Sequence, residues 1–235
     1  MNAQNPPTYR TGSELDFRPS PAVASQVFTQ AFLWMFAGLL VTAVTAYFVQ
    51  SNTDYVNAVG RNFFIAFIVQ VGLALAIQGL IRRLNPLVAL ALFFVFAVSI
   101  GLTVGAIVSF YTEASVATAF LSAASIFGAA AIYGYTTKRP LTKYAQYIPI
   151  VLIGWIVAVG INWLIGGSQF TLILSLITVV LFTALTAYDV KRLQQGDFVI
   201  WAGGPERGAV LAAVHLYINF INIFVSLLNL MGSRE

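Results

Sequence analysis

Long apolar stretches separated by short polar connections run along most of this chain. Each is close to the roughly 20 residues that an α-helix needs to cross the hydrocarbon layer of a bilayer. Lipid offers no partners to backbone amides and carbonyls, so an open chain at that depth is expected to be helical. The pattern predicts seven transmembrane helices, at residues 27–50, 62–81, 86–111, 115–137, 144–165, 170–189 and 208–231. Polar tails are predicted at 1–26 and 232–235.

The composition points to the same class of protein. Apolar residues make up 59% of the chain and charged residues 9%, whereas about a quarter of the residues in an ordinary soluble domain are charged. The prediction is an all-α integral membrane protein that crosses the bilayer several times. The 12 basic and 8 acidic residues are too few and too dispersed for a nucleic-acid-binding surface. The absence of cysteine excludes disulfides, thiolate catalysis and thiolate metal sites.

The basic residues are distributed unevenly over the connections between the apolar runs. Lysine and arginine are enriched in cytoplasmic loops, and all but two of the 12 fall in the N-terminal tail and in the second, fourth and sixth connections. This bias predicts a cytoplasmic N-terminus, an external C-terminus and a sixth run that is directed inward. The biased set is Arg10, Arg18, Arg82, Arg83, Lys138, Arg139, Lys143, Lys191, Arg192 and Arg207, and the two exceptions are Arg61 and Arg234.

Polar residues recur at helical spacing on the sixth and seventh runs. Intervals of three and four residues place such side chains on one face of a helix. One interpretation is a packing seam, in which hydroxyls and amides bond between helices. The other is a water-accessible polar pathway beside the seventh run, because unsatisfied buried polar groups are costly. The residues are Thr186 and Asp189 on the sixth run, and His215, Asn219, Asn222, Ser226 and Asn229 on the seventh.

Asp189 ends an otherwise uncharged run of about twenty residues. An ionisable group at membrane depth is costly and is usually paired or functional. The charge bias puts Arg82 and Arg83 on the same side of the membrane, and either is a candidate partner. Protonation of Asp189 would break such a pair, so acid-triggered opening is the functional interpretation. The alternative is a carboxylate at a helix end that simply meets water at the interface.

Two segments near the C-terminus resemble the paired signature of a known family. They read A-Y-D-V-K-R-L at 187–193 and H-L-Y-I-N-F-I-N-I-F-V-S-L-L-N-L-M-G at 215–232. Together they resemble the Bax inhibitor-1 or YccA family, also called the transmembrane Bax inhibitor motif family, in its bacterial form. Weaker likenesses occur at 32–43, F-L-W-M-F-A-G-L-L-V-T-A, and at 99–104, S-I-G-L-T-V. The resemblance therefore extends over nearly the whole chain.

The resemblance implies a seven-helix fold in which one central helix is wrapped by the others. It also implies a pH-sensitive calcium leak channel, with two aspartates as the sensor and an arginine that latches the closed form. The first aspartate falls on Asp189, the arginine on Arg83 and the second aspartate on Asn219. A bacterial inner membrane is the implied location.

The asparagine at 219 departs from that pattern. Two carboxylates that share a site disfavour each other's charged form, and Asn219 removes this coupling. We therefore expect the site to titrate as a single carboxylate, at lower pH than in a member with two aspartates. His215, one turn earlier, is a second candidate proton-sensitive group. Calcium prefers six to eight oxygen ligands, so no tight metal site is predicted, although a leak does not need tight binding.

The sequence also bears on two other functions, enzymatic activity and a non-conducting role in the membrane. No H-E-x-x-H, G-x-S-x-G or phosphate-binding loop is present, so neither enzymatic activity nor a cofactor is expected. The competing hypothesis, implied by the resemblance, is a non-conducting membrane protein. It would modulate a membrane-anchored protease or another partner in stress or cell death, and it would be indifferent to the state of Asp189.

Overall fold

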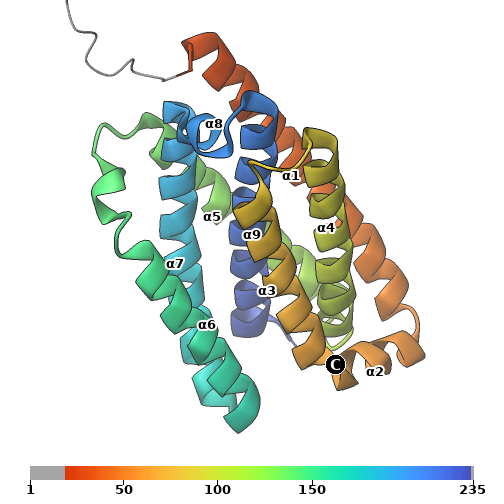
Figure 1. Ribbon diagram of the computed structural model, residues 1–235. Coiled ribbons are helices and arrows are strands. Elements are labelled where there is room, and N and C mark those ends of the chain that lie inside the picture. Colours follow the sequence, from red (N-terminus) through yellow and green to blue (C-terminus); the bar gives the residue numbers. More distant parts are fainter. Residues whose placement is uncertain (1–18, 234–235) are drawn as a thin grey trace, which may run out of the picture.

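The computed structural model describes residues 19–233, and this part of the chain is a bundle of helices (Figure 1). The connections are short, and no strand occurs within the described range. In chain order the helices are α1 (Pro21–Gln50), α2 (Thr53–Arg61), α3 (Phe63–Leu80), α4 (Pro86–Val108), α5 (Glu113–Thr136), the 3₁₀ helix η1 (Leu141–Tyr144), α6 (Ile148–Ile165), α7 (Ser168–Gln195), α8 (Asp197–Ala202) and α9 (Pro205–Met231).

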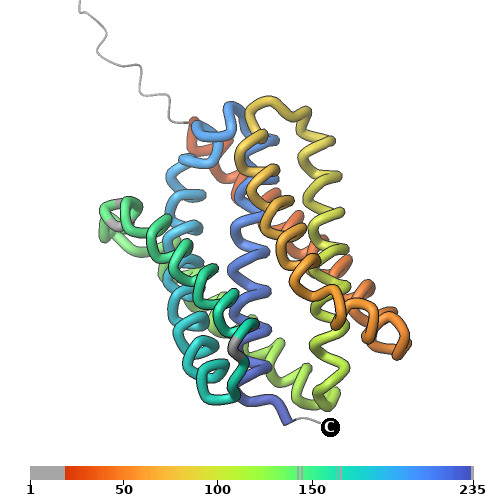
Figure 2. The backbone as a smooth tube through the Cα atoms, turned by 60° about the horizontal axis from the view of Figure 1, so that its bottom comes forward, coloured from red at the N-terminus to blue at the C-terminus, as the bar shows by residue number. Residues whose placement is uncertain are grey.

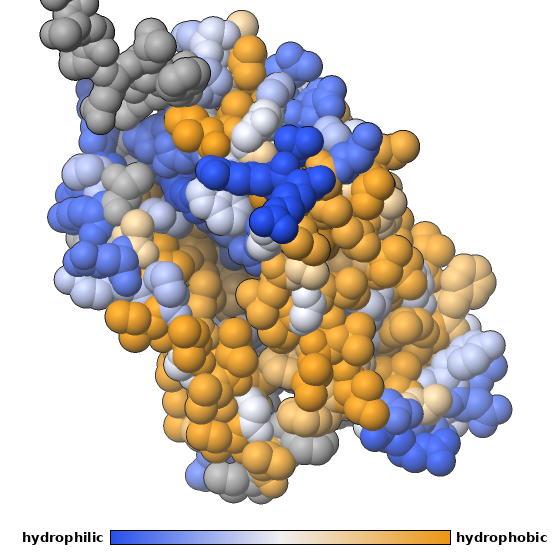
Figure 3. Space-filling model, viewed as in Figure 1, coloured by the Kyte–Doolittle hydropathy of each residue, from blue (hydrophilic) through white to orange (hydrophobic). Residues whose placement is uncertain are grey.

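Six of the helices are long and apolar enough to cross a bilayer: α1, α3, α4, α5, α7 and α9. The face of the molecule seen in Figure 3 has a broad apolar zone, with hydrophilic residues gathered towards its ends. The fifth predicted span, 144–165, corresponds to α6, whose apolar stretch Ile148–Asn162 is shorter. The multi-pass membrane fold is therefore confirmed, and the count of seven crossings stays a prediction.

Most helix ends lie within a few residues of the predicted boundaries, and the two largest differences occur at the start of the first helix and the end of the sixth predicted run. The first helix begins at Pro21, inside the predicted tail 1–26, because the Ser20 side chain accepts a hydrogen bond from the Val23 amide and proline suits the first helical turn. The sixth predicted run does not end at 189, since α7 continues to Gln195 and stops at Gly196 in a left-handed conformation, φ 79°. The short helices α2 and α8 were not predicted. Residues 1–18 of the tail lie outside the described residues.

Helix α9 has the most buried position in the bundle. Within the apolar stretch of α9 that is long enough to cross the bilayer, 78% of the residues are buried. In the other candidate spans this share is at most 39%. It packs against α1, α4, α5, α7 and α8, and both ribbon views show it inside the bundle (Figures 1 and 2). The main contacts of α6 are with α7. One deeply buried helix is thus present, while a wrap by all the other helices is not shown.

Close approach between helices depends on glycine at three positions. A Cβ on Gly101 or Gly105 of α4 would lie within 3 Å of α1, and one on Gly134 of α5 would lie 2.3 Å from the Ala187 carbonyl oxygen of α7. A Cβ on Gly128, in the same helix as Gly134, would meet nothing within 4 Å. Small residues therefore fix the α1–α4 and α5–α7 contacts.

Polar bonds join the helices between these contacts. The Thr42 hydroxyl of α1 donates to the Ala97 carbonyl of α4 at 3.0 Å and lies 2.5 Å from the hydroxyl of Tyr217 on α9. Because the single Thr42 proton goes to Ala97, Tyr217 is the donor to Thr42. Trp155 of α6 donates to Thr178 of α7 at 2.8 Å. Side-chain hydroxyl groups thus join α1 to α4 and α9, and α7 to α6.

Candidate functional site

Asp189 lies inside α7, six residues before the helix ends at Gln195. The residue is only 4% exposed. The sequence leaves open a carboxylate that meets water at the membrane interface, and this burial decides against it. A buried carboxylate needs partners that offset its lost hydration.

The partners of Asp189 come from α9. The Asn219 Nδ2 atom donates to Asp189 Oδ2 at 2.9 Å, and His215 Nδ1 lies 3.4 Å from Asp189 Oδ1. His215 and Asn219 are four residues apart, so one face of α9 presents both side chains to the carboxylate. We call Asp189, His215 and Asn219 the Asp189 cluster.

Helix α8 lies beside the histidine of this cluster. The side chain of His215 is 24% exposed, and its ring packs edge-on against Phe198, with the centroids 5.2 Å apart. The guanidinium of Arg192 lies 4.7 Å from the centroid of the same phenylalanine ring and pairs with Asp197 at 3.8 Å. The histidine thus connects a buried carboxylate to the end of the bundle where charged side chains gather.

The predicted ion pair between Arg83 and Asp189 is not formed. Arg83 is exposed, and among the described residues the basic side chain that contacts Asp189 is His215. The neighbouring connections are held by other bonds. Arg82 Nε donates to the Trp201 carbonyl at the end of α8, and Arg207 Nε donates to the Leu84 carbonyl at 2.8 Å. Asp189 instead faces α9, which already supplies an imidazole and an amide.

The residues of the predicted polar pathway are buried or bonded within their own helices. Thr186 is fully buried and donates to the Phe182 carbonyl at 2.7 Å. Asn222 donates to the Ile218 carbonyl at 2.8 Å, and Ser226 is buried. At the far end of α9, Asn229 accepts a hydrogen bond from the Tyr111 hydroxyl at 2.9 Å.

Two cavities lie on either side of this polar seam. One of about 670 Å³ opens between α2, α3 and α4, and Asn229 and Arg61 are among its lining residues. The other, of about 350 Å³, lies between α5, η1, α6 and α7. No residue of the Asp189 cluster lines either cavity. Asn229, at the opposite end of α9 from the cluster, is the residue of this polar seam that lines one of them.

Metal coordination by the cluster would be sparse. No group of three or more histidine, cysteine, aspartate or glutamate side chains that could hold a metal ion occurs in residues 19–233. Asp189 and the amide oxygen of Asn219 offer few of the six to eight oxygens that calcium prefers. The cluster joins α7 to α9 through a carboxylate, an amide and an imidazole.

Phe198 was not foreseen as a neighbour of this site. It lies in a six-residue helix between Gly196 and Gly203, both with positive φ. Two glycines on either side of a short apolar, aromatic segment are the signal that could have indicated a pair of tight turns, which bring this segment back against α9.

A family model described as "Inhibitor of apoptosis-promoting Bax1" matches residues 24–235. This chain belongs to the Bax inhibitor family. The resemblance carried by 187–193 and 215–232 is thereby confirmed. The match begins just after the start of α1 and therefore includes every candidate span almost completely.

Bacterial relatives of this Bax inhibitor family chain match it over nearly their full length. The inner membrane protein YbhL of Escherichia coli K12 is 33% identical over 88% of this chain and 91% of its own. An uncharacterized protein of Borreliella burgdorferi is 33% identical over 91% and 94%, and one of Deinococcus radiodurans is 34% identical over 88% and 90%. The protein is thus a multi-pass integral membrane protein of the Bax inhibitor family.

Proposed function

We propose that this protein is a pH-sensitive cation leak channel, with calcium as the ion, whose closed form is held by the Asp189 cluster. The observation that carries the proposal is a carboxylate 4% exposed that binds α9 through both oxygens, to Asn219 and to His215. A charged group at this depth makes the α7–α9 contact depend on its protonation state.

The direction of gating follows from proton linkage. The ionised form of Asp189 accepts a charge-assisted hydrogen bond from Asn219, which is stronger than a bond to a neutral carboxyl group. The closed form therefore favours the deprotonated carboxylate, and a form in which α7 and α9 separate binds the proton more readily. As pH falls, the equilibrium moves towards the open form.

His215 strengthens the closed form in this proposal. A charged imidazole 3.4 Å from the carboxylate would favour its ionised form. Protonation of Asp189 then leaves an imidazolium that faces a neutral acid beside Phe198. This change removes the pair and releases α7 from α9.

The cation path in this proposal follows α9 away from the cluster. Thr186, Asn222 and Ser226 follow the cluster along α7 and α9, and Asn229 reaches the 670 Å³ cavity at the opposite end. Hydroxyl and amide oxygens that now bond within helices would be the groups that a passing cation meets. A leak needs such weak, multiple contacts and no tight site.

Calcium flux into liposomes tests the proposal. Wild-type protein should show flux that rises as pH falls. Asp189→Asn, which mimics a neutral carboxyl group, should give flux that no longer depends on pH. Arg83→Gln should behave as wild type, because Arg83 forms no pair with Asp189. Absence of wild-type flux at every pH, or an unchanged pH profile in Asp189→Asn, would contradict the channel.

The second candidate function is a non-conducting modulator of a membrane-anchored protease or of another stress or cell-death partner. The observation that favours it is that Thr186 and Asn222 are bonded within their helices and that the cluster lines neither of the two cavities described above. It predicts no flux and no effect of Asp189→Asn on the partner. For either function we propose the bacterial inner membrane as the location, with a cytoplasmic N-terminus.

A further inference from the structure

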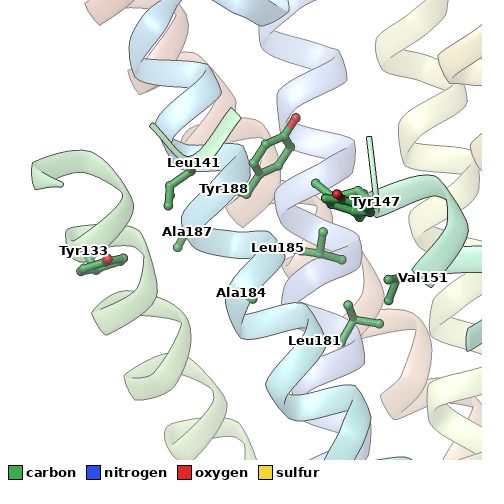
Figure 4. A pocket seen from close by; sticks show the side chains of 10 residues that line it. Tyr133, Leu141, Tyr147, Val151, Leu181, Ala184, Leu185, Ala187 and Tyr188 are labelled. Atoms are coloured by element: carbon green, nitrogen blue, oxygen red, sulfur yellow. The ribbon is translucent and has the colours of Figure 1, made fainter. Parts of the chain in front are cut away.

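An apolar cavity of about 350 Å³ opens between α5, α6 and α7, away from the Asp189 cluster (Figure 4). Its volume lies within the range of about 300–1,000 Å³ that small-molecule sites occupy. Tyr133, Tyr147 and Val151 at its edge are each 46–54% exposed, so the cavity is open at the side of the bundle. Its lining is Tyr133, Leu141, Tyr147, Ile148, Val151, Leu181, Ala184, Leu185, Ala187 and Tyr188.

Two features place one end of this cavity at the level of the lipid headgroups. Tyr133, Tyr147 and Tyr188 line it, and tyrosine is enriched where a membrane protein meets the headgroup region. The connection between α5 and η1 runs past the same end, because both Tyr133 before it and Leu141 after it line the cavity. This connection contains Lys138 and Arg139.

Two basic side chains beside the cavity are free to bind an anionic group. Lys138 and Arg139 are exposed, and the structure gives neither side chain a hydrogen bond or an ion pair. Lys191 of α7 differs, since its ammonium donates to the Thr137 carbonyl and to Gln194, each at 2.8 Å. The bond from Lys191 to the Thr137 carbonyl ties the α5–η1 connection to α7 and holds Lys138 and Arg139 next to the cavity.

We propose that this cavity binds one anionic phospholipid, with an acyl chain between α5, α6 and α7 and the headgroup phosphate against Lys138 and Arg139. The apolar slot suits the acyl chain of a lipid. The interfacial tyrosines and the two unpaired basic side chains suit its anionic headgroup. The proposal does not depend on ion conduction, since it concerns a different face of α7.

The charge beside the cavity favours a lipid over a transmembrane helix of a partner protein. A single acyl chain is thin enough to enter along the apolar slot. Lys138 and Arg139 favour an anionic headgroup over a zwitterionic one.

Lipid retention on the purified protein tests the headgroup contact. The wild-type protein is reconstituted in an equimolar mixture of phosphatidylcholine and phosphatidylglycerol and is analysed by native mass spectrometry. It should retain phosphatidylglycerol in preference to phosphatidylcholine. Lys138→Gln and Arg139→Gln should each lower the retained phosphatidylglycerol by about fivefold, as expected for one basic residue near a membrane surface. Arg83→Gln, an exposed charge at the same end of the bundle, is the control and should leave retention unchanged.

A second pair of variants tests the acyl chain contact. Ala184 lines the cavity and is exposed, so Ala184→Trp fills the slot without disturbing the core. Val180, one turn away on α7 and 64% exposed, does not line the cavity and makes Val180→Trp the matched control. Lipid retention should be lost in the first variant and kept in the second. Equal retention of the two lipids by the wild type, or equal retention by the two tryptophan variants, would overturn the proposal.

Discussion

At the residue scale, the partners of Asp189 are an amide and an imidazole. The sequence indicates that Asp189, Asn219 and His215 are linked by position, because helical spacing puts the last two on one face of α9. It does not indicate that Arg83 points elsewhere. Counting charges on each side of a membrane locates a residue along the membrane normal, whereas a pair also requires the right direction around the helix axis. That direction is set by which helices pack together.

Restoring a second carboxylate should raise the pH at which the channel opens. In Asn219→Asp the new acid would lie where the Asn219 amide is now, 2.9 Å from an Asp189 oxygen. Two carboxylates so close cannot both be charged without a cost, so a proton binds at higher pH. We expect the midpoint of calcium flux to rise by roughly one pH unit or more. The control Gln78→Glu adds an acid on α3, whose side chain bonds only the Ala74 carbonyl of its own helix. An unmoved midpoint in Asn219→Asp would contradict the assigned role of Asn219.

Removing the histidine should also raise the opening midpoint, but for a different reason. His215→Gln keeps hydrogen-bonding capacity near Asp189 and removes the positive charge that forms as pH falls. Without an opposite charge 3.4 Å away, the ionised form of Asp189 is less favoured, so the carboxylate binds its proton at a higher pH. The expected rise in the flux midpoint is about one pH unit. A fall of the midpoint in this variant would show that the imidazole does not stabilise the closed form.

At the element scale, the sequence predicts the long helices well and the short ones poorly. The apolar runs correspond to α1, α3, α4, α5, α6, α7 and α9, because hydropathy over about twenty residues is a strong signal. Helix α2 has no buried residue and α8 has only six residues, so neither leaves such a signal. The extension of α7 to Gln195 was missed because the charges after Asp189 resemble the end of a span, although they lie on further turns of the same helix.

The contact between α5 and α7 should be sensitive to a single methyl group at one glycine. In Gly134→Ala the new Cβ would lie 2.3 Å from the Ala187 carbonyl oxygen, two residues before Asp189. The helices must separate there, at a cost of about 1–3 kcal/mol. Gly128→Ala, in the same helix, meets nothing within 4 Å and should be neutral or slightly stabilising, because alanine favours a helix by up to about 1 kcal/mol. Thermal unfolding in detergent measures both. Equal effects of the two variants would show that the close approach does not hold α5 against α7.

At the scale of the whole molecule, what the sequence cannot supply is the arrangement of the helices around α9. Every long helix is apolar on most of its surface, so hydropathy does not distinguish a face that meets lipid from one that meets another helix. The buried position of α9 is indicated only by its smaller and more polar residues, such as Ala212, Ala213 and Asn219. The cavity beside α7 depends on how far α6 lies from α5, which is a property of packing alone.

The number of crossings and the orientation of the bundle can be tested together. Figure 1 shows the described start of α1 at the end of the bundle that holds α8, and the end of α9 at the opposite end, beside α2. An odd number of crossings puts the termini on opposite sides of the membrane, so the test depends on whether α6 crosses. The natural chain has no cysteine, and single cysteines at exposed positions therefore report their own side without background.

In intact cells a membrane-impermeant maleimide should label Ser51→Cys, in the turn after α1, and Ser168→Cys, at the start of α7, but not Arg139→Cys. This pattern follows from the predicted cytoplasmic N-terminus, together with a crossing by α6 between residues 139 and 168. Labelling of Arg139→Cys with protection of the other two would reverse the orientation. Protection of both Arg139→Cys and Ser168→Cys would mean that α6 does not cross, and it would contradict the opposite placement of the two ends of the chain in Figure 1.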